Sequence, residues 1–529
     1  MDFSAADSLT LVGVLAAAVA LLALADVLGI PYPIPLVVGG LALGFVPGMP
    51  EIELPPDLVL VAVLPPLLYG AAFFTSLREL RANARPIGLL AIGLVLMTML
   101  VVAALAHAVI PGIDWPTAFV LGAIVSPTDP TAATAIAQRV GLPRRLVGLV
   151  EGEGLVNDGT ALVAYRFAVA AVVTGSFSLW EAGGRFVLNV AGGIAVGLAV
   201  GLVIREARRR LDNPPLELTI SLMSGYFAYL PAEALHVSGV LAAVTVGIYM
   251  GWHTPQLTNA QMRLQGQAVW EIVFFLLNAL LFTLVGLQMP VIIDRLSGYS
   301  TGDLIGWALM VNLAVIGARF VWVFASLYVP HLLKARRSMD PTPSWQSKVV
   351  VAWAGMRGAV SLAAALALPL TTDAGAQFPN RELIVFLTFS VILGTLVVQG
   401  LTLPALIRLL DVEDDRLEEI EDTKARIHAA EAALARLDEL VDEDWVREDT
   451  AERLRGLYDF RRSRFQERIE EGGDGSIEQR SADYQRLMRE LLDAERQAVV
   501  ELRRERRISD DVMRRVVRDF DLEEARLDL

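Results

Sequence analysis

The chain has 529 residues, of which 54% are hydrophobic, and a mean hydropathy of +0.51. These values place most of it in a lipid bilayer. The chain has no cysteine, which excludes disulfides, thiolate metal sites and cysteine nucleophiles. Residues 411–529 contain 36 acidic and 23 basic side chains, so this segment carries −13 of the total charge of −14. We therefore expect a nearly neutral membrane domain, residues 1–410, followed by a cytoplasmic helical and acidic domain, residues 411–529.

Apolar stretches that could cross a bilayer recur between residues 8 and 409. They lie near residues 8–30, 33–48, 57–76, 86–110, 116–137, 146–173, 182–204, 216–235, 238–252, 267–289, 303–330, 346–370 and 382–409. The pattern predicts an all-α polytopic membrane protein with about 13 transmembrane helices.

Basic residues alternate between the loops that connect these spans. Every second loop, starting with residues 77–85, contributes to a total of fifteen arginines and lysines, whereas the intervening loops and flanks hold three. Because positively charged loops stay in the cytoplasm, the N-terminus is predicted outside and the tail inside. An odd number of spans follows from this orientation, and the cell (inner) membrane is the expected location.

Two spans contain helix-breaking sequences. The fifth includes Pro127 and Pro130, which lack backbone donors and clash with preceding carbonyls, and the twelfth includes glycines on both sides of Arg357. Unwound backbone survives at membrane depth only where protein or a water-filled cavity satisfies it. The two spans are the middle members of groups 4–6 and 11–13, which enter the membrane from opposite sides. This arrangement is typical of an inverted-repeat transporter with two broken helices.

The sixth span contains polar residues that are costly in lipid. On a helix, Gly154 and Asp158 share one face, and Glu153 and Asn157 share the adjacent one. We therefore expect the Asp158 side chain to extend past Gly154, where there is room for a small ligand. Glu153 points in another direction and needs a cationic partner. Ionisable groups inside a membrane are usually functional, so this helix is predicted to carry the site.

Depth along the spans brings several charges together. At 1.5 Å per residue, Asp129, Asp158, Arg319 and Arg357 each come near the bilayer midplane. Together with Glu153, these groups sum to −1, which one monovalent cation or one proton would cancel. Carboxylate and carbonyl oxygens suit an alkali cation, and Asp158 can hold either a proton or a cation, not both. Exchange of the two follows if the protein moves only when Asp158 is neutralised.

Two other functions fit part of this pattern. An intramembrane aspartyl protease also needs two carboxylates on neighbouring spans, although two midplane arginines have no place in it. A cation channel gated by the tail would also contain buried acids, although channels are usually built from symmetric filters or charged rings. The tail itself has helical periodicity, and it is either regulatory or a solvated helical bundle without a ligand.

These residues resemble the cation–proton antiporter 1 family. The resemblance rests on Glu153 with Asn157-Asp158, on Ser-Pro-Thr-Asp-Pro-Thr one span earlier, and on Gly-Met-Arg-Gly-Ala-Val-Ser-Leu-Ala in the twelfth span. It covers all thirteen spans, and the tail resembles that of the bacterial NhaP-like branch. It implies a transporter, not an enzyme, that exchanges sodium, with potassium or lithium as alternatives, for protons in a 1:1 electroneutral cycle serving pH and sodium homeostasis.

The family fold implies a core of spans 4–6 and 11–13, a dimerisation domain of spans 1–3 and 8–10, and a linker in span 7. The core would move like an elevator within a homodimer in the lipid bilayer. No cofactor and no nucleic acid partner are implied, and the tail's ligand is not indicated.

The resemblance also implies roles for individual residues. Asp158 matches the cation- and proton-binding carboxylate, and it would bind the transported Na⁺ or other alkali cation together with Asp129 and the Thr128 backbone. Glu153 and Arg319 match a structural ion pair.

Five further residues, Gly154 among them, are expected to support this site. Asn157 matches the neutral residue that holds the helix crossing, and Arg357 matches the arginine of the second broken helix. Pro127 and Pro130 shape the unwound segment of the first.

Two positions depart from the pattern of the family. Gly154 stands where some relatives have a serine ligand, and Gly70 stands where some have an acid. Water would have to fill the missing coordination, and the selectivity between cations does not follow from the resemblance.

Overall fold

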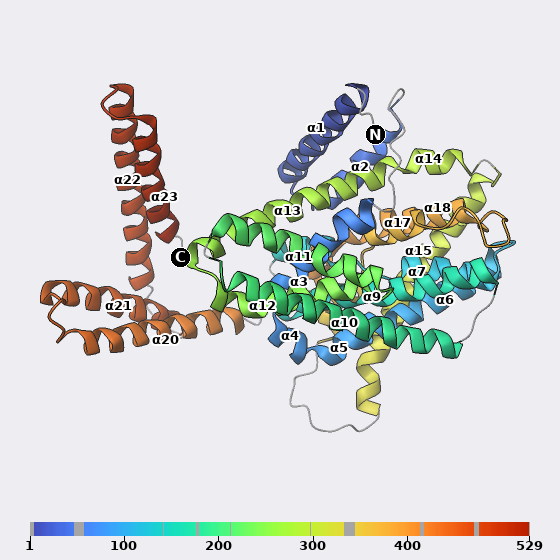
Figure 1. Ribbon diagram of the computed structural model, residues 1–529, viewed down its shortest axis with the longest axis horizontal. Helices are drawn as coiled ribbons and strands as arrows, with labels where there is room; N and C mark the ends of the chain where they lie inside the picture. Colours follow the sequence, from blue (N-terminus) through green and yellow to red (C-terminus); the bar gives the residue numbers. More distant parts are fainter. Residues whose placement is uncertain are drawn as a thin grey trace. The chain divides into compact units, whose positions relative to one another are not determined.

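The computed structural model describes residues 5–46, 58–140, 142–175, 179–211, 213–296, 298–332, 344–412, 417–469 and 476–527. Helices form nearly all of the regular structure in these ranges, where the only isolated β-bridge joins Thr371 and Gln377. The predicted all-α class is confirmed (Figure 1). The chain divides into two compact units, Met1–Asp414 and Asp415–Leu529.

The helices of the first unit overlap the described part of each predicted span. They are α1 (Ala5–Leu28), α2 (Pro33–Gly44), α3 (Leu64–Phe74), α4 (Leu77–Ala82), α5 (Ala84–Gly88), α6 (Val95–Val109), α7 (Trp115–Val125), α8 (Pro130–Val140), α9 (Arg144–Thr174), α10 (Leu179–Arg208), α11 (Pro214–Ala234), α12 (Gly239–Leu257), α13 (Ala260–Leu287), α14 (Met289–Asp294), α15 (Thr301–Leu332), α16 (Trp345–Trp353), α17 (Ala359–Leu366), α18 (Arg381–Gly394) and α19 (Gly400–Leu410). Three π-helical segments join them: η1 (Leu58–Val63), η2 (Leu89–Leu94) and η3 (Thr395–Gln399).

Six continuous helical stretches of the described residues are long and apolar enough to cross a membrane. They are Ala84–Val109, Arg144–Thr174, Gly183–Arg208, Met262–Asp294, Thr301–Ser326 and Arg381–Leu410. Their outer faces carry exposed aliphatic side chains, among them Val187, Leu202 and Val203 on α10. Such faces suit contact with lipid, so the first unit is that of a multi-pass membrane protein.

The two predicted interruptions are confirmed. Residues 126–129 separate α7 from α8, and residues 354–358 separate α16 from α17. The unwound segments meet directly, because the backbone N–H of Asp129 donates to the carbonyl oxygen of Met356 at 2.8 Å. Each segment therefore satisfies part of the backbone that the other leaves without a helical partner.

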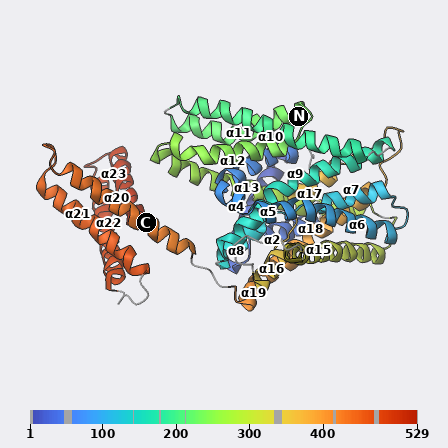
Figure 2. The same cartoon turned by 90° about the horizontal axis from the view of Figure 1, so that it is seen from below.

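The helices of the first unit pack in two groups. The first helix group consists of α2, α3 and α10–α13, and the second consists of α6–α9 and α15–α19. Helix α9 packs against α7 and also contacts α10 and α12, and Figure 2 shows it between α10 and α7. The long helix α9 thus lies where the two groups meet.

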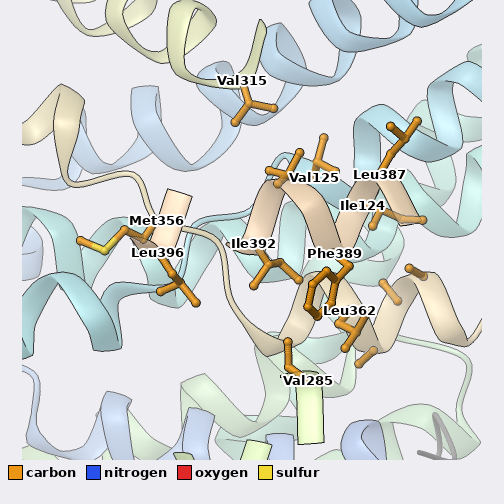
Figure 3. Close-up of a cluster of buried hydrophobic side chains, with 14 of the residues drawn as sticks. Ile124, Val125, Val285, Val315, Met356, Leu362, Leu387, Phe389, Ile392 and Leu396 are labelled. Carbon is orange, nitrogen blue, oxygen red and sulfur yellow. The ribbon is translucent and has the colours of Figure 1, made fainter. Parts of the chain in front are cut away.

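A hydrophobic cluster that includes side chains of both helix groups surrounds the unwound segments (Figure 3). Its buried side chains come from both broken helices and from their neighbours. They include Ile124 and Val125 of α7, Met356, Leu362 of α17, Leu387, Phe389 and Ile392 of α18, and Leu396 of η3. The apolar packing on both sides of the breaks holds the unwound backbone in one place.

The second unit contains α20 (Leu417–Leu440), α21 (Glu448–Ile469), α22 (Ser476–Arg504) and α23 (Asp510–Leu527). Helix α20 packs against α21, and α22 packs against α23. Arg496 joins the second pair, since its guanidinium contacts Asp521 at 2.8 Å and also Glu524. The hydrogen bond with Glu524 raises the pKa of Arg496.

Candidate ion-binding site

A cavity of about 510 Å³ lies between the two helix groups. The first group contributes residues of α3 and α13 to its wall, and the second contributes residues of α8, α9 and α17. Its polar lining includes Thr128, Asp129, Glu151, Asp158 and Ser361, and the described residues place no arginine, lysine or histidine there. The negative and neutral oxygens around this cavity suit a cation.

Asp158 is a nearly buried carboxylate of the cavity wall to which the described residues offer no partner. The side chain belongs to the middle of α9 and is 7% exposed. No hydrogen-bond donor among the described residues contacts it, and it lines the cavity directly. A nearly buried carboxylate without a donor or cationic partner is costly unless a proton or a cation occupies it.

Asp129, in contrast, is engaged by the protein. Its Oδ1 accepts hydrogen bonds from the backbone N–H of Thr131 at 2.9 Å and from the Thr131 hydroxyl. Asp129 thus caps the N-terminus of α8, where the helix dipole favours a negative charge. The Asp129 carboxylate also lies against Gly358, so closely that a Cβ on Gly358 would overlap it. Gly358 is the N-cap residue of α17, so Asp129 also lies beside the N-terminus of this helix.

A buried network ties the unwound segment to α9 and α15. Arg319 forms an ion pair with Glu153, with Nη2 at 2.8 Å from Oε2, and also donates to the Val351 carbonyl at 3.0 and 3.2 Å. The Thr128 hydroxyl donates to Glu153 Oε1 at 2.9 Å and accepts from Asn157 Nδ2 at 2.7 Å. Arg319 is fully buried, and Glu153 and Asn157 are each 1% exposed. The network therefore fixes the position of Thr128, which lines the cavity, while Glu153, Asn157 and Arg319 do not line it.

Arg357 lies at the C-terminal ends of α7 and α16, the first halves of the two broken helices. Val125 is the last residue of α7, and its carbonyl oxygen accepts a hydrogen bond from Arg357 Nε at 3.1 Å. Arg357 Nη1 donates to the Gly355 carbonyl. Its backbone N–H donates to Thr395 Oγ1 at 3.1 Å. A buried cation at helix C-termini complements their partial negative charge. Arg357 therefore supports the crossing and does not line the cavity.

Two glycines are explained by close packing. A Cβ at position 154 would lie 2.6 Å from Pro130 Cδ, so the Pro130 ring packs against the bare face of Gly154. Gly154 and Asp158 both line the cavity of about 510 Å³, so space for a small ligand lies beside this glycine. A Cβ at Gly70 would lie 2.8 Å from Trp270 Cζ3 and would also meet Phe274. An acid at position 70 would therefore displace two aromatic rings.

The sequence did not indicate three features of this region. They are the Thr128 side chain as the link between Glu153 and Asn157, Thr131 as the donor to Asp129, and Ser361 in the cavity wall. Thr128 and Thr131 belong to the Pro-Thr-Asp-Pro-Thr motif, so the sequence did contain the two hydroxyls that make these contacts. Among the described residues, no group of three or more His, Cys, Asp or Glu side chains could hold a resident metal ion.

Two unwound helices that cross beside a membrane-embedded cavity with an unpartnered carboxylate define an ion-coupled secondary transporter. A family model described as "Sodium/hydrogen exchanger, transmembrane" matches residues 14–409. The chain belongs to this family of cation/proton antiporters, which are transporters and not enzymes. The predicted family membership is confirmed.

Individual relatives agree with this assignment. An uncharacterized Na(+)/H(+) exchanger of Mycobacterium tuberculosis is 38% identical over 524 residues, 97% of this chain and 96% of that protein. A sodium, potassium, lithium and rubidium/H(+) antiporter of Bacillus pumilus is 35% identical over 432 residues, 78% of this chain and 64% of that protein. The sodium proton antiporter MjNhaP1 from Methanocaldococcus jannaschii shares the fold, with a TM-score of 0.61 at 20% identity over 77% of this chain and 99% of that chain.

Proposed function

We propose that the protein exchanges one monovalent cation for one proton across the cell membrane, with Asp158 binding both in turn. Na⁺ is the principal cation of this proposal, with K⁺ and Li⁺ as alternatives, and the cycle serves pH and sodium homeostasis. The observation that carries the proposal is the unpartnered Asp158 carboxylate in a cavity without a basic residue among its described lining. One carboxylate of this kind holds one positive charge, as H⁺ or as a cation, which makes the exchange electroneutral.

Other residues of the site receive supporting roles. Asp129 and the Thr128 carbonyl oxygen supply further ligands, although the bonds from Thr131 already use one oxygen of Asp129. Glu153, Arg319 and Asn157 hold the unwound segment against α9 through their buried hydrogen bonds. Their charges cancel within the network, which leaves Asp158 to respond to the ion alone.

Movement of the second helix group against the first would carry the site across the membrane. The cavity lies between these groups, so a displacement along their interface would change the side from which Asp158 is reached. In this proposal spans 4–6 and 11–13 form the moving core, spans 1–3 and 8–10 form the dimerisation domain, and span 7 links them. The N-terminus lies outside, and residues 411–529 form a cytoplasmic regulatory domain.

The homodimer is a separate part of the proposal, taken from the family resemblance. It would hold the first helix group still while the core moves. Cross-linking in native membranes tests it, since a protein that is monomeric there and still exchanges ions would refute the dimer but not the exchange.

Exchange is tested with purified protein in sealed liposomes that hold an acidic interior and a pH-sensitive dye. We expect Na⁺, added outside, to release protons from the liposomes, and Asp158→Asn to abolish this release. Asp303→Asn removes an acid from the first turn of α15, outside the cavity, and should leave exchange unchanged. Comparison of Na⁺, K⁺ and Li⁺ gives the selectivity.

The same liposomes separate exchange from a tail-gated channel. An electroneutral exchanger keeps its rate when valinomycin and K⁺ clamp the membrane potential at zero. A channel would instead carry cations without a pH gradient and would respond to the potential. Potential-driven cation flux that is independent of protons would overturn the proposal.

A further inference from the structure

Ser361 is a buried polar residue of the cavity wall that no role described so far uses. It belongs to the first turn of α17, is 2% exposed, and lines the same cavity as Asp158 and Asp129. Its hydroxyl has no hydrogen-bond partner among the residues that the structure describes. Leaving a buried hydroxyl unsatisfied costs about 1–3 kcal/mol, so such a group calls for a partner that is not part of the chain.

The broken helix explains why this hydroxyl lacks the usual acceptor. Buried serines and threonines in helices normally donate to the carbonyl four residues earlier, as Ser224 does to Ile220 at 2.6 Å and Thr283 to Ala279 at 2.8 Å. The corresponding residue for Ser361 is Arg357, which lies in the unwound segment 354–358. The interruption therefore removes the intrahelical acceptor and leaves the hydroxyl at the cavity.

Packing prevents the helix from turning Ser361 away. The next residue, Leu362, is fully buried in the hydrophobic cluster around the unwound segments (Figure 3). At the start of the helix, Gly358 lies so close to the carboxylate of Asp129 that α17 cannot shift toward it. The rotation and the position of α17 are thus fixed with Ser361 in the cavity wall.

A bound alkali cation needs several oxygen ligands. The neutral ones in the cavity wall include the side chains of Thr134 and Asn278, which donate to the Thr131 and Phe274 carbonyls, and Ser361, whose hydroxyl makes no hydrogen bond among the described residues. Asp158 is unpartnered, one oxygen of Asp129 is used by Thr131, and Gly154 has no side chain. The hydroxyl oxygen of Ser361 is a hard, neutral ligand of the kind that Na⁺ and Li⁺ prefer. A cation held by Asp158 at this place would give the lone pairs of this hydroxyl oxygen a partner.

We propose that Ser361 is a ligand of the transported cation, with its hydroxyl oxygen joining the carboxylate of Asp158. This inference rests on the proposed function for the presence of a transported cation. It assigns to α17, the second half of a broken helix, a direct part in cation affinity. The proton needs no such ligand, so Ser361 would favour the cation over the proton.

The test compares Ser361→Ala with Ser126→Ala in liposomes. Ser126 is 1% exposed and also adjoins an unwound segment, but its hydroxyl donates to Ala123 at 2.9 Å and does not line the cavity. We expect Ser361→Ala to raise the apparent KM for Na⁺ about tenfold, with the maximal rate nearly unchanged. Ser126→Ala should keep the KM, and Ser361→Thr, which retains an oxygen, should restore most of the affinity.

The KM for Na⁺ at high pH shows whether Ser361 binds the cation or only donates a hydrogen bond to the Asp158 carboxylate. Where protons no longer compete, loss of a cation ligand still raises the KM, whereas loss of a hydrogen bond to Asp158 alone would not. An unchanged KM at high pH would overturn the inference. If Ser361→Ala does not fold, Ser361→Cys replaces the oxygen by a sulfur of similar position, and Na⁺ should then stabilise the variant less against heat than it does the wild type.

The outcomes distinguish this inference from the function on which it rests. Wild-type exchange that Asp158→Asn abolishes, together with a normal KM in both Ser361→Ala and Ser361→Cys, would overturn the role of Ser361 alone. Absence of exchange in the wild-type protein would instead overturn the proposed function.

Discussion

Removal of Glu153 should destabilise the protein more than it changes cation binding. In the structure, Arg319 is fully buried and Glu153 is 1% exposed, and Glu153 is the acidic partner of Arg319. Glu153→Ala would leave a guanidinium in the interior for which, among the described residues, the Val351 carbonyl alone accepts hydrogen bonds. Breaking a buried pair in this way costs about 3–5 kcal/mol, because the remaining charge is uncompensated.

A second loss adds to the first. The Thr128 hydroxyl donates to Glu153, so the variant also removes an acceptor from the unwound segment, which is worth about 1 kcal/mol. We therefore expect a free energy of unfolding lower by about 4–6 kcal/mol and a midpoint of thermal unfolding lower by several degrees. Thermal unfolding in detergent measures the stability, and liposome exchange measures the apparent KM for Na⁺ of the fraction that folds.

A double-mutant cycle tests whether the two residues act as a pair. Glu153→Ala combined with Arg319→Ala removes both charges, so the loss should be clearly smaller than the sum of the single losses. Arg210→Ala is the control, because Arg210 and Glu206 form an exposed pair, with 77% and 51% of the side chains accessible, and should leave the midpoint unchanged. Additive losses, or a KM effect without a loss of stability, would refute the structural role.

Three further changes have expected outcomes. Truncation after Leu410 should leave an inserted, exchanging protein with altered activation by pH or cation, and a folded truncation that transports nothing would show that the tail does more than modulate. Gly154→Ala places a Cβ 2.6 Å from Pro130 and should lower the free energy of unfolding by about 1–3 kcal/mol, whereas Gly13→Ala, with nothing within 4 Å, should not. Asp129→Asn keeps an oxygen to cap α8, so it should slow exchange without abolishing it, and a complete loss of exchange in folded protein would make this residue an obligatory ligand.

The sequence was sufficient to predict where the membrane helices break. Pro127 and Pro130 lack the donors that a continuous helix needs, and the structure is unwound at residues 126–129. Gly355 and Gly358 flank Arg357, and the structure is also unwound at residues 354–358, because glycine weakens a helix. These are local effects of backbone chemistry, and they can be read from short stretches of sequence.

The partners across the site could not be read in the same way. The need of Glu153 for a cation was evident, but its hydrogen bond with Thr128 depends on how α9 packs against the unwound segment. The close approach of Pro130 to Gly154 and the exposure of Ser361 to the cavity depend likewise on the crossing of two broken helices. Side-chain contacts between segments far apart in sequence need the tertiary structure.

The central claim is that a proton and a cation compete for Asp158, and the pH dependence of the apparent KM tests it most directly. Exchange is measured in liposomes over a range of Na⁺ concentrations at several pH values. On the acidic side, each tenfold rise in proton concentration should raise the KM for Na⁺ about tenfold, while the maximal rate changes little. A KM that stays constant while the maximal rate falls with pH, or proton-coupled exchange that persists in well-folded Asp158→Asn, would contradict the account.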